Sequence, residues 1–170
     1  MQKTPINSSV SISEHPQELR LWLRLLTCTQ LIETQVKNQL REHFSTTLSR
    51  FDLLSQLERA PDGLKMNELS KRLMVTSGNV TGITDQLVSD GLVTRVVVPQ
   101  DRRAFLIQMT PLGRAKFNEM AQLHEQWIVN AFANLSDSEI GQLYGLLNKV
   151  KEKNAGNSQS DLDPRHHPVN

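Results

Sequence analysis

Two adjacent arginines, Arg102 and Arg103, lie between two runs that are rich in β-forming residues, LVTRVVV and AFLIQMT. The segment between the runs, PQDRR, is polar, so the sequence predicts a β-hairpin that carries the arginine pair at its tip. The narrow minor groove of A·T-rich DNA concentrates negative potential, which an inserted guanidinium group can use. Asp101 can orient Arg103 through charge-assisted hydrogen bonds while Arg102 reaches a phosphate. We therefore expect a DNA contact at this tip.

A helix-turn-helix pattern comes before the hairpin, in the segment MNELSKRLMVTSGNVTGITDQLVSDG. Asn67 can cap a first short helix and Thr76 can cap a second, with a tight turn at Met74 and Val75 between them. Gly91 is expected to end the second helix. Two short helices joined in this way present the polar side of the second helix to the DNA major groove.

The second helix of this pair carries small polar side chains. We expect Ser77, Asn79 and Thr81 to offer hydrogen-bonding groups to base edges. Gly78 and Gly82 permit a close approach of the helix backbone. Arginine and lysine are absent from this face, so specificity is expected to depend on these polar contacts, on water and on the hairpin.

Positive charge is concentrated in the same segment. The whole chain has a formal net charge of only +1, with 19 basic and 18 acidic residues. Between Lys65 and Lys116 there are eight basic residues against four acidic ones, a local excess of +4. Neutralising phosphates requires such a local excess. We count Lys71, Arg72 and Arg95 among the expected DNA contacts.

Helical patterns flank the predicted DNA-binding segment on both sides. From Gln17 to about Arg41 the chain lacks proline and glycine, and its apolar residues form two helical tracks. A helix that is apolar on two sides is expected to be buried on two sides, by its own core and by a partner subunit.

The starts of three further helices can be read from the sequence. Ser49 resembles the start of a second helix. Thr110 and Pro111 can open a helix after the hairpin, and the capping box SDSE opens the last one, with Ile140, Leu143, Leu147 and Val150 facing inward.

The order of these motifs resembles the MarR family of winged-helix regulators, from about residue 17 to residue 153. The resemblance is carried by ELSKRLMVTSGNVTGITDQLVSDGLV followed at the same spacing by DRRAFLIQMTPLGR. It implies an obligate homodimer, joined by the first and last helices, that binds a pseudo-palindromic operator and represses nearby genes. In the family a small molecule bound between the two lobes commonly releases the DNA. Asp101 and Arg103 match the acid and the minor-groove arginine of the wing, whereas Gly82 departs from members that carry a basic residue there.

The expected fold is mainly α with a small β-hairpin wing, in a dimeric MarR-like winged helix-turn-helix architecture. The expected parts are a flexible N-terminus at 1–13, a helical dimerisation region at 17–45 and 117–153, a winged helix-turn-helix domain at 48–116 and a flexible tail at 154–170.

Arg20 and Arg24 lie one helical turn apart among leucines on the first helix. An unpaired guanidinium group is costly to bury, so each can snorkel or pair with an acid of a partner chain. Alternatively, the two can clamp the carboxylate of an aromatic acid, which suits the planar fork of arginine. The segment LRLWLRLLTCTQLIETQ resembles a branch of the family that is tied to the catabolism of aromatic acids, including hydroxycinnamates. The expected walls of such a pocket are Trp22, Cys28, His124 and Trp127.

Other classes of protein fit less well. The chain has no glycine-rich phosphate loop, no HExxH motif and no nucleophile elbow, so we predict no enzyme. The single cysteine excludes an internal disulfide and a CxxC metal site, and neither a metal nor a cofactor is expected. The N-terminal segment lacks the apolar core of a signal peptide, which favours a cytoplasmic protein. Two alternatives stay open: a redox sensor that works through Cys28, expected to be buried, and a winged-helix module that binds protein instead of DNA.

Overall fold

The computed structural model describes residues 16–98 and 101–160, with side chains at 16–97 and 105–154. The chain divides into two compact units, and the division falls between Trp127 and Ile128. The predicted N-terminal segment 1–13 and residues 161–170 of the predicted tail lie outside the described residues. The fold is mostly helical with one small sheet, which confirms the predicted fold class.

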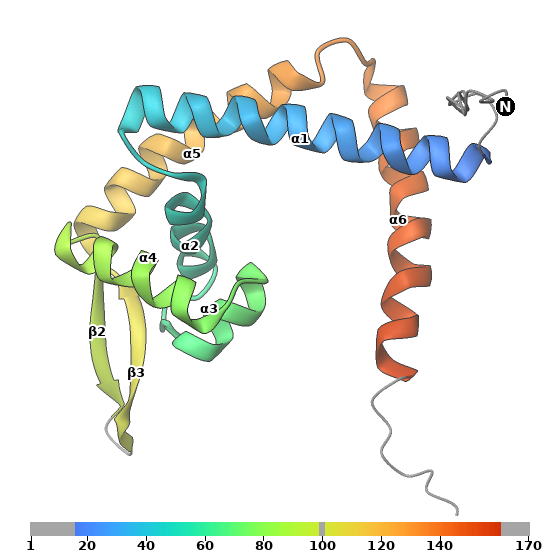
Figure 1. Ribbon diagram of the computed structural model, residues 1–170. Coiled ribbons are helices and arrows are strands. Elements are labelled where there is room, and N and C mark those ends of the chain that lie inside the picture. The colour runs from blue at the N-terminus through green and yellow to red at the C-terminus, as the bar shows by residue number, and fades with distance from the viewer. Residues whose placement is uncertain (1–15, 99–100, 161–170) are drawn as a thin grey trace, which may run out of the picture. The chain divides into compact units, whose positions relative to one another are not determined.

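The first unit holds the helix-turn-helix and the hairpin (Figure 1). Its elements are α1 (Gln17–Phe44), α2 (Leu48–Glu58), β1 (Leu64–Lys65), α3 (Met66–Leu73), α4 (Ser77–Ser89), β2 (Val93–Val98), β3 (Asp101–Met109) and most of α5 (Pro111–Ala131). In Figure 1 the β2–β3 hairpin extends away from α2, α3 and α4. The second unit holds the end of α5 and α6 (Asp137–Ser160). Helix α6 thus continues through 154–160, which the sequence analysis assigned to a flexible tail, because no proline interrupts that segment.

The sheet is antiparallel with the strand order β1-β3-β2. Strand β1 pairs through Leu64 with Ile107, and the sequence analysis missed it because two residues are too few for an alternating pattern. The β2–β3 ladder runs regularly from Val93, opposite Met109, to Val97, opposite Phe105.

The ladder then steps to Val98 opposite Asp101, so that residues 102–104 have no partner on β2. The expectation that all of PQDRR is a loop is therefore wrong for Asp101, Arg102 and Arg103, which belong to β3. Pro99 and Gln100 lie outside the described residues. Polar residues can occupy a strand here because the end of a projecting hairpin has no core to face.

The core of the first unit forms where α2, α3 and α4 meet the sheet. Leu54, Leu69, Leu87 and Ile107 are each at most 1% exposed, and they come from these three helices and from β3. Val80, Ile83 and Leu87 of α4 are all buried and form one apolar stripe along the helix. This packing sets the side of α4 that is left for other contacts.

The helix caps confirm some predictions and correct others. The Thr76 hydroxyl accepts a hydrogen bond from the Asn79 backbone N–H at 3.3 Å, as expected for the start of α4. Helix α3, however, begins one residue before Asn67, and the Glu68 carboxylate accepts from the Lys65 N–H at 2.9 Å. Helix α2 is capped by the hydroxyl of Thr47 rather than by Ser49, because Thr47 already supplies the acceptor for the first turn.

The end of α4 and the start of α5 meet in a tight junction. The Thr110 hydroxyl donates to the Gly91 carbonyl at 2.7 Å, and the Thr110 N–H donates to the Leu92 carbonyl at 3.0 Å. The same hydroxyl accepts from the Gly113 N–H at 3.0 Å, which confirms Thr110 as the cap of α5. A Cβ atom on Gly113 would lie only 1.9 Å from the Leu92 carbonyl oxygen.

Both terminal helices expose apolar side chains in the single chain. Only Val36 and Leu40 of α1 are buried, and Cys28, which we expected to be buried, is exposed. Ile140, Leu147 and Val150 of α6 are exposed although the sequence analysis placed them inward. The rest of the described chain does not cover these faces. The exposed apolar residues of α1 are Leu19, Leu21, Trp22, Leu23, Leu26 and Leu31.

We predict that Gly113→Ala destabilises the protein by about 2 kcal/mol or more, since the new methyl group would overlap backbone atoms that cannot move aside. Gly145→Ala on α6 is the matched control: its Cβ would meet open space, and alanine in a helix interior is favoured over glycine by about 1 kcal/mol. Urea unfolding followed by circular dichroism measures both changes. Equal midpoints for the two variants would contradict the tight junction.

Candidate nucleic-acid interface

Helix α4 has one buried and one exposed side. Val80, Ile83, Thr84 and Leu87 face the core, and the opposite side is exposed. Ser77 and Thr81 are one helical turn apart on the same flank of the exposed side. Asn79 is about 160° around the helix from Thr81, on the other flank. The structure therefore brings together two of the three residues that were expected to read base edges.

Glycines occupy the middle of the exposed side of α4. A Cβ atom built on Gly78 or on Gly82 would meet no other atom within 4 Å. The surface between the Ser77–Thr81 flank and the Asn79 flank therefore carries no side chain at these two positions. A groove wall or a base edge can approach the helix backbone closely here.

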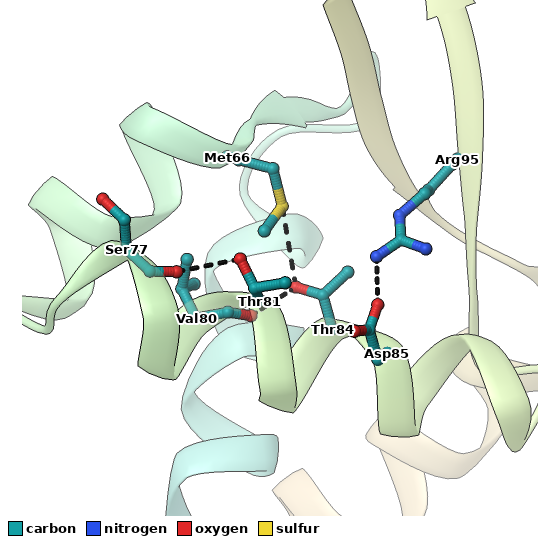
Figure 2. A network of polar contacts seen from close by, with 7 residues as sticks. All are labelled: Met66, Ser77, Val80, Thr81, Thr84, Asp85 and Arg95. Carbon is teal, nitrogen blue, oxygen red and sulfur yellow. Dashed lines mark hydrogen bonds and ion pairs between the residues drawn. The ribbon is translucent and has the colours of Figure 1, made fainter.

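Threonine hydroxyls on α4 bond to its own backbone (Figure 2). The Thr81 hydroxyl donates to the Ser77 carbonyl at 2.9 Å, and the buried Thr84 hydroxyl donates to the Val80 carbonyl at 2.8 Å. The Thr84 oxygen also lies 3.7 Å from the sulfur of Met66 on α3. Thr84 thus fills the contact between the two helices without leaving its hydroxyl unsatisfied.

An ion pair links α4 to the hairpin. The Arg95 guanidinium on β2 donates to the Asp85 carboxylate on α4, as Figure 2 shows. The side chains of Arg95 and Asp85 are 38% and 55% exposed, so both can also reach a solvent-side partner. The sequence analysis counted Arg95 among the expected contacts but missed Asp85. An acidic residue on the polar side of the second helix was the available signal.

The remaining predicted DNA contacts lie on either side of α4. Lys71 and Arg72 are exposed in the last turn of α3. They precede Met74, which turns the chain in a left-handed conformation with φ 54° and is 94% exposed. The backbone of Asp101, Arg102 and Arg103 belongs to β3, while their side chains lie outside the described residues, so the proposed orientation of Arg103 by Asp101 stays a prediction.

Two further ion pairs tie this unit together. Arg50 of α2 pairs with Asp90, which caps the C-terminal end of α4, and Arg114 of α5 pairs with Glu58 of α2. Arg50 also lines an open cavity of about 510 Å³, and its Nε atom is buried there without a hydrogen-bond partner. The other residues that line this cavity are His43, Phe44, Ser45, Thr46, Asp90, Leu92, Leu112, Lys116 and Met120.

The residues expected to form an effector pocket fall into two groups. Arg20 and Arg24 line a surface hollow of about 430 Å³ with Gln17 and Leu21. Trp22 and Cys28 are exposed on the same stretch of α1. His124 and Trp127 instead lie near the other end of α1, where the Trp127 ring is 5.7 Å from that of His43. Since α1 rises 1.5 Å per residue, His43 is about 28 Å from Arg24. One chain does not bring the two groups together.

Burial perturbs two titratable groups near α2. The His124 ring lies 4.7 Å from the ring of Phe51, and burial lowers the pKa of His124. Burial and, to a lesser extent, the negative charge of Glu33 raise the pKa of Asp52. Both shifts favour the neutral form of the side chain.

The described residues contain no group of three or more His, Cys, Asp or Glu side chains placed to hold a metal ion. Within the same residues, no helix is both long enough and apolar enough to cross a membrane.

Comparison with known proteins finds similarity to transcriptional regulators. A model of the MarR family matches residues 44–104. The chain is 34% identical over 86 residues to the uncharacterised HTH-type transcriptional regulator YkoM of Bacillus subtilis. This match covers 51% of the chain and 56% of YkoM. The chain is 31% identical over 121 residues to the HTH-type transcriptional repressor YetL of the same organism, covering 68% of this chain and 72% of YetL.

A solved structure gives the same result for the fold. A cysteine-to-serine variant of MarR from E. coli, crystallised with operator DNA, is 30% identical to the chain with a TM-score of 0.68. The match covers 78% of this chain and 95% of the E. coli chain.

We predict that His124 makes the protein less stable in mild acid. Its pKa is lowered in the folded state, so the unfolded chain takes up a proton near its ordinary pKa of about 6.5 while the folded chain does not. The free energy of unfolding should therefore fall as the pH drops below that value. His124→Phe keeps a ring against Phe51 and removes the titration. Urea unfolding at pH 7.5 and pH 5.5 should show a smaller loss for this variant, and equal losses would contradict the assignment.

Proposed function

Since the chain belongs to the MarR family of transcriptional regulators, we propose that it is a homodimeric repressor that binds a pseudo-palindromic operator and leaves it when a small aromatic carboxylate binds. Members of the family are regulators rather than enzymes, in agreement with the absence of catalytic motifs. The observation that carries the proposal is the exposed polar side of α4 next to a hairpin that bears paired arginines. A role on DNA implies a cytoplasmic protein.

The proposed DNA contacts divide between two grooves. The Ser77–Thr81 flank and the glycines of α4 enter the major groove, where small polar groups and close backbone approach suit base edges. Arg103 enters the adjacent minor groove, while Lys71, Arg72 and Arg102 bind phosphates. The local excess of +4 between Lys65 and Lys116 supports phosphate contacts by this segment.

The proposed dimer uses the apolar faces of α1 and α6. Leu21, Trp22 and Leu31 of α1 are 56%, 58% and 67% exposed, and Tyr144 of α6 is 69% exposed. Apolar surface of this extent is typical of a protein interface. A twofold dimer would present two copies of α4 to two half-sites of one operator. The ranges 17–45 and 117–153 are accordingly proposed as the dimerisation region and 48–116 as the DNA-binding domain.

The proposed effector site is centred on Arg20 and Arg24. Both line the hollow on α1, and neither forms an ion pair within the described part of the chain. Their guanidinium groups can bind one carboxylate from two sides, and Trp22 and Cys28 can contact an aromatic ring. His124 and Trp127 are too far away in the same chain, so their proposed part in the pocket requires a second subunit.

We predict that Arg103→Ala weakens DNA binding more than Arg102→Ala, because insertion into a groove contributes more than one phosphate contact. Removing a phosphate contact should reduce the slope of log K against log salt by about 1. Fluorescence anisotropy on DNA from upstream of the protein's own gene, over a salt series, measures the affinity and the salt slope of each variant. Equal losses would contradict the assigned geometry, and a wild-type protein that binds no duplex would favour the protein-binding module.

We predict that Arg20→Ala and Arg24→Ala each lose the response to an aromatic acid and keep the affinity for DNA. The measurement is release of the labelled duplex by a panel of benzoates and hydroxycinnamates. Wild-type release that both variants retain would place the effector site elsewhere. Cys28, which is exposed in the single chain, provides the test of the redox alternative: Cys28→Ser should lose a response to peroxide only if the protein is a thiol sensor.

A further inference from the structure

The register of the hairpin separates its side chains into two faces. Arg95 is opposite Ile107 and Val97 is opposite Phe105, so these side chains share one face. Val96 is opposite Leu106, and their side chains share the other face. The two adjacent valines therefore point to opposite sides of the same strand.

The first of these faces is directed toward α4. At the base of the hairpin it is part of the core, where Val93 is 2% exposed and Ile107 is fully buried. One step further out, Arg95 reaches across to Asp85 of α4 (Figure 2). The next step carries Val97 and Phe105, which are 48% and 42% exposed. This apolar pair thus continues the core face one step further toward the end of the hairpin.

We propose that Arg95, Val97 and Phe105 form a seat for the sugar-phosphate backbone of one DNA strand. We call these three residues the wing seat. The proposal rests on the proposed function, in which α4 enters the major groove and the hairpin tip reaches the adjacent minor groove. The strand that separates these two grooves must then pass between α4 and the hairpin, along the face that the wing seat occupies.

The chemistry of the wing seat fits a nucleic-acid backbone. A DNA strand alternates charged phosphates with the largely apolar faces of deoxyribose rings. Arg95 carries five N–H donors, and its hydrogen bond to Asp85 uses one nitrogen, so donors remain for a phosphate oxygen. Val97 and Phe105 lie next along the strand and can pack against the sugar that follows. Contacts of this kind add affinity for any sequence, because they touch no base edge.

Val97 and Phe105 adjoin the Arg95–Asp85 ion pair on the same face, and this favours DNA over a protein partner. A protein segment on this face would have to cover Val97 and Phe105 together with Arg95 and Asp85, which are both partly exposed and charged. A DNA backbone alternates charge with apolar surface, and the side chains along this face do the same.

The test compares Val97→Ser with Val96→Ser in the full chain. The two residues are neighbours of the same type with similar exposure, 48% and 37%, on opposite faces. Anisotropy is measured over a salt series on the duplex from upstream of the protein's own gene and on a scrambled duplex of the same composition. We expect Val97→Ser to lose about fivefold in affinity on both duplexes with an unchanged salt slope, since the lost contact is apolar. Val96→Ser should bind like the wild type.

Two further variants complete the test. Phe105→Ser should lose affinity in the same way as Val97→Ser, and Arg95→Ala should instead reduce the salt slope by about 1. Urea unfolding checks that Val97→Ser and Val96→Ser are folded to the same extent. If the wild type binds both duplexes and Val97→Ser loses no more than Val96→Ser, the wing seat is wrong and the proposed function stands. If the wild type binds neither duplex, the proposed function fails and the wing seat fails with it.

Discussion

The Leu92 carbonyl lies directly against Gly113, and the arrangement of α4, the hairpin and α5 depends on this contact. The first turn of α5 approaches the chain between α4 and β2 so closely that any side chain at position 113 would overlap the carbonyl oxygen. Thr110 closes the same junction by bonding to Gly91 and Leu92 while it caps α5. The end of α4, the start of the hairpin and the start of α5 are thereby held at one point, which sets the direction in which the hairpin projects.

The ion pairs of the first unit orient elements more than they stabilise them. Arg114 with Glu58 and Arg95 with Asp85 are all more than a third exposed, and exposed pairs contribute little free energy because water screens them. Their value lies in geometry, since each joins two different elements around the core. Asp85 in particular places a negative charge on the side of α4 that is proposed to face DNA, and Arg95 offsets it.

The local signals in the sequence predicted the local structure well. Thr76 and Thr110 are helix caps because their hydroxyls serve N–H groups three residues ahead, a pattern that is readable over four residues. Strand β1, the step in the ladder after Val97, and the Arg95–Asp85 pair depend on contacts between distant segments, which spacing along one chain does not reveal. The expected pocket failed to assemble in one chain for the same reason: apolar periodicity placed Arg24 and His124 on helices but not at the same end of α1.

The hydrogen bond between Thr81 and the Ser77 carbonyl determines which chemical groups this position can recognise. A threonine hydroxyl has a single proton, and here the helix backbone holds it, so the side chain turns only lone pairs and a methyl group outward. Such a surface can accept from an exocyclic amino group of adenine or cytosine and can contact the methyl group of thymine, whereas it has no proton to give to the O6 or N7 of guanine. In the proposed complex, Thr81 therefore offers a base edge an acceptor and a methyl group, and donation is left to other side chains of α4 such as Asn79.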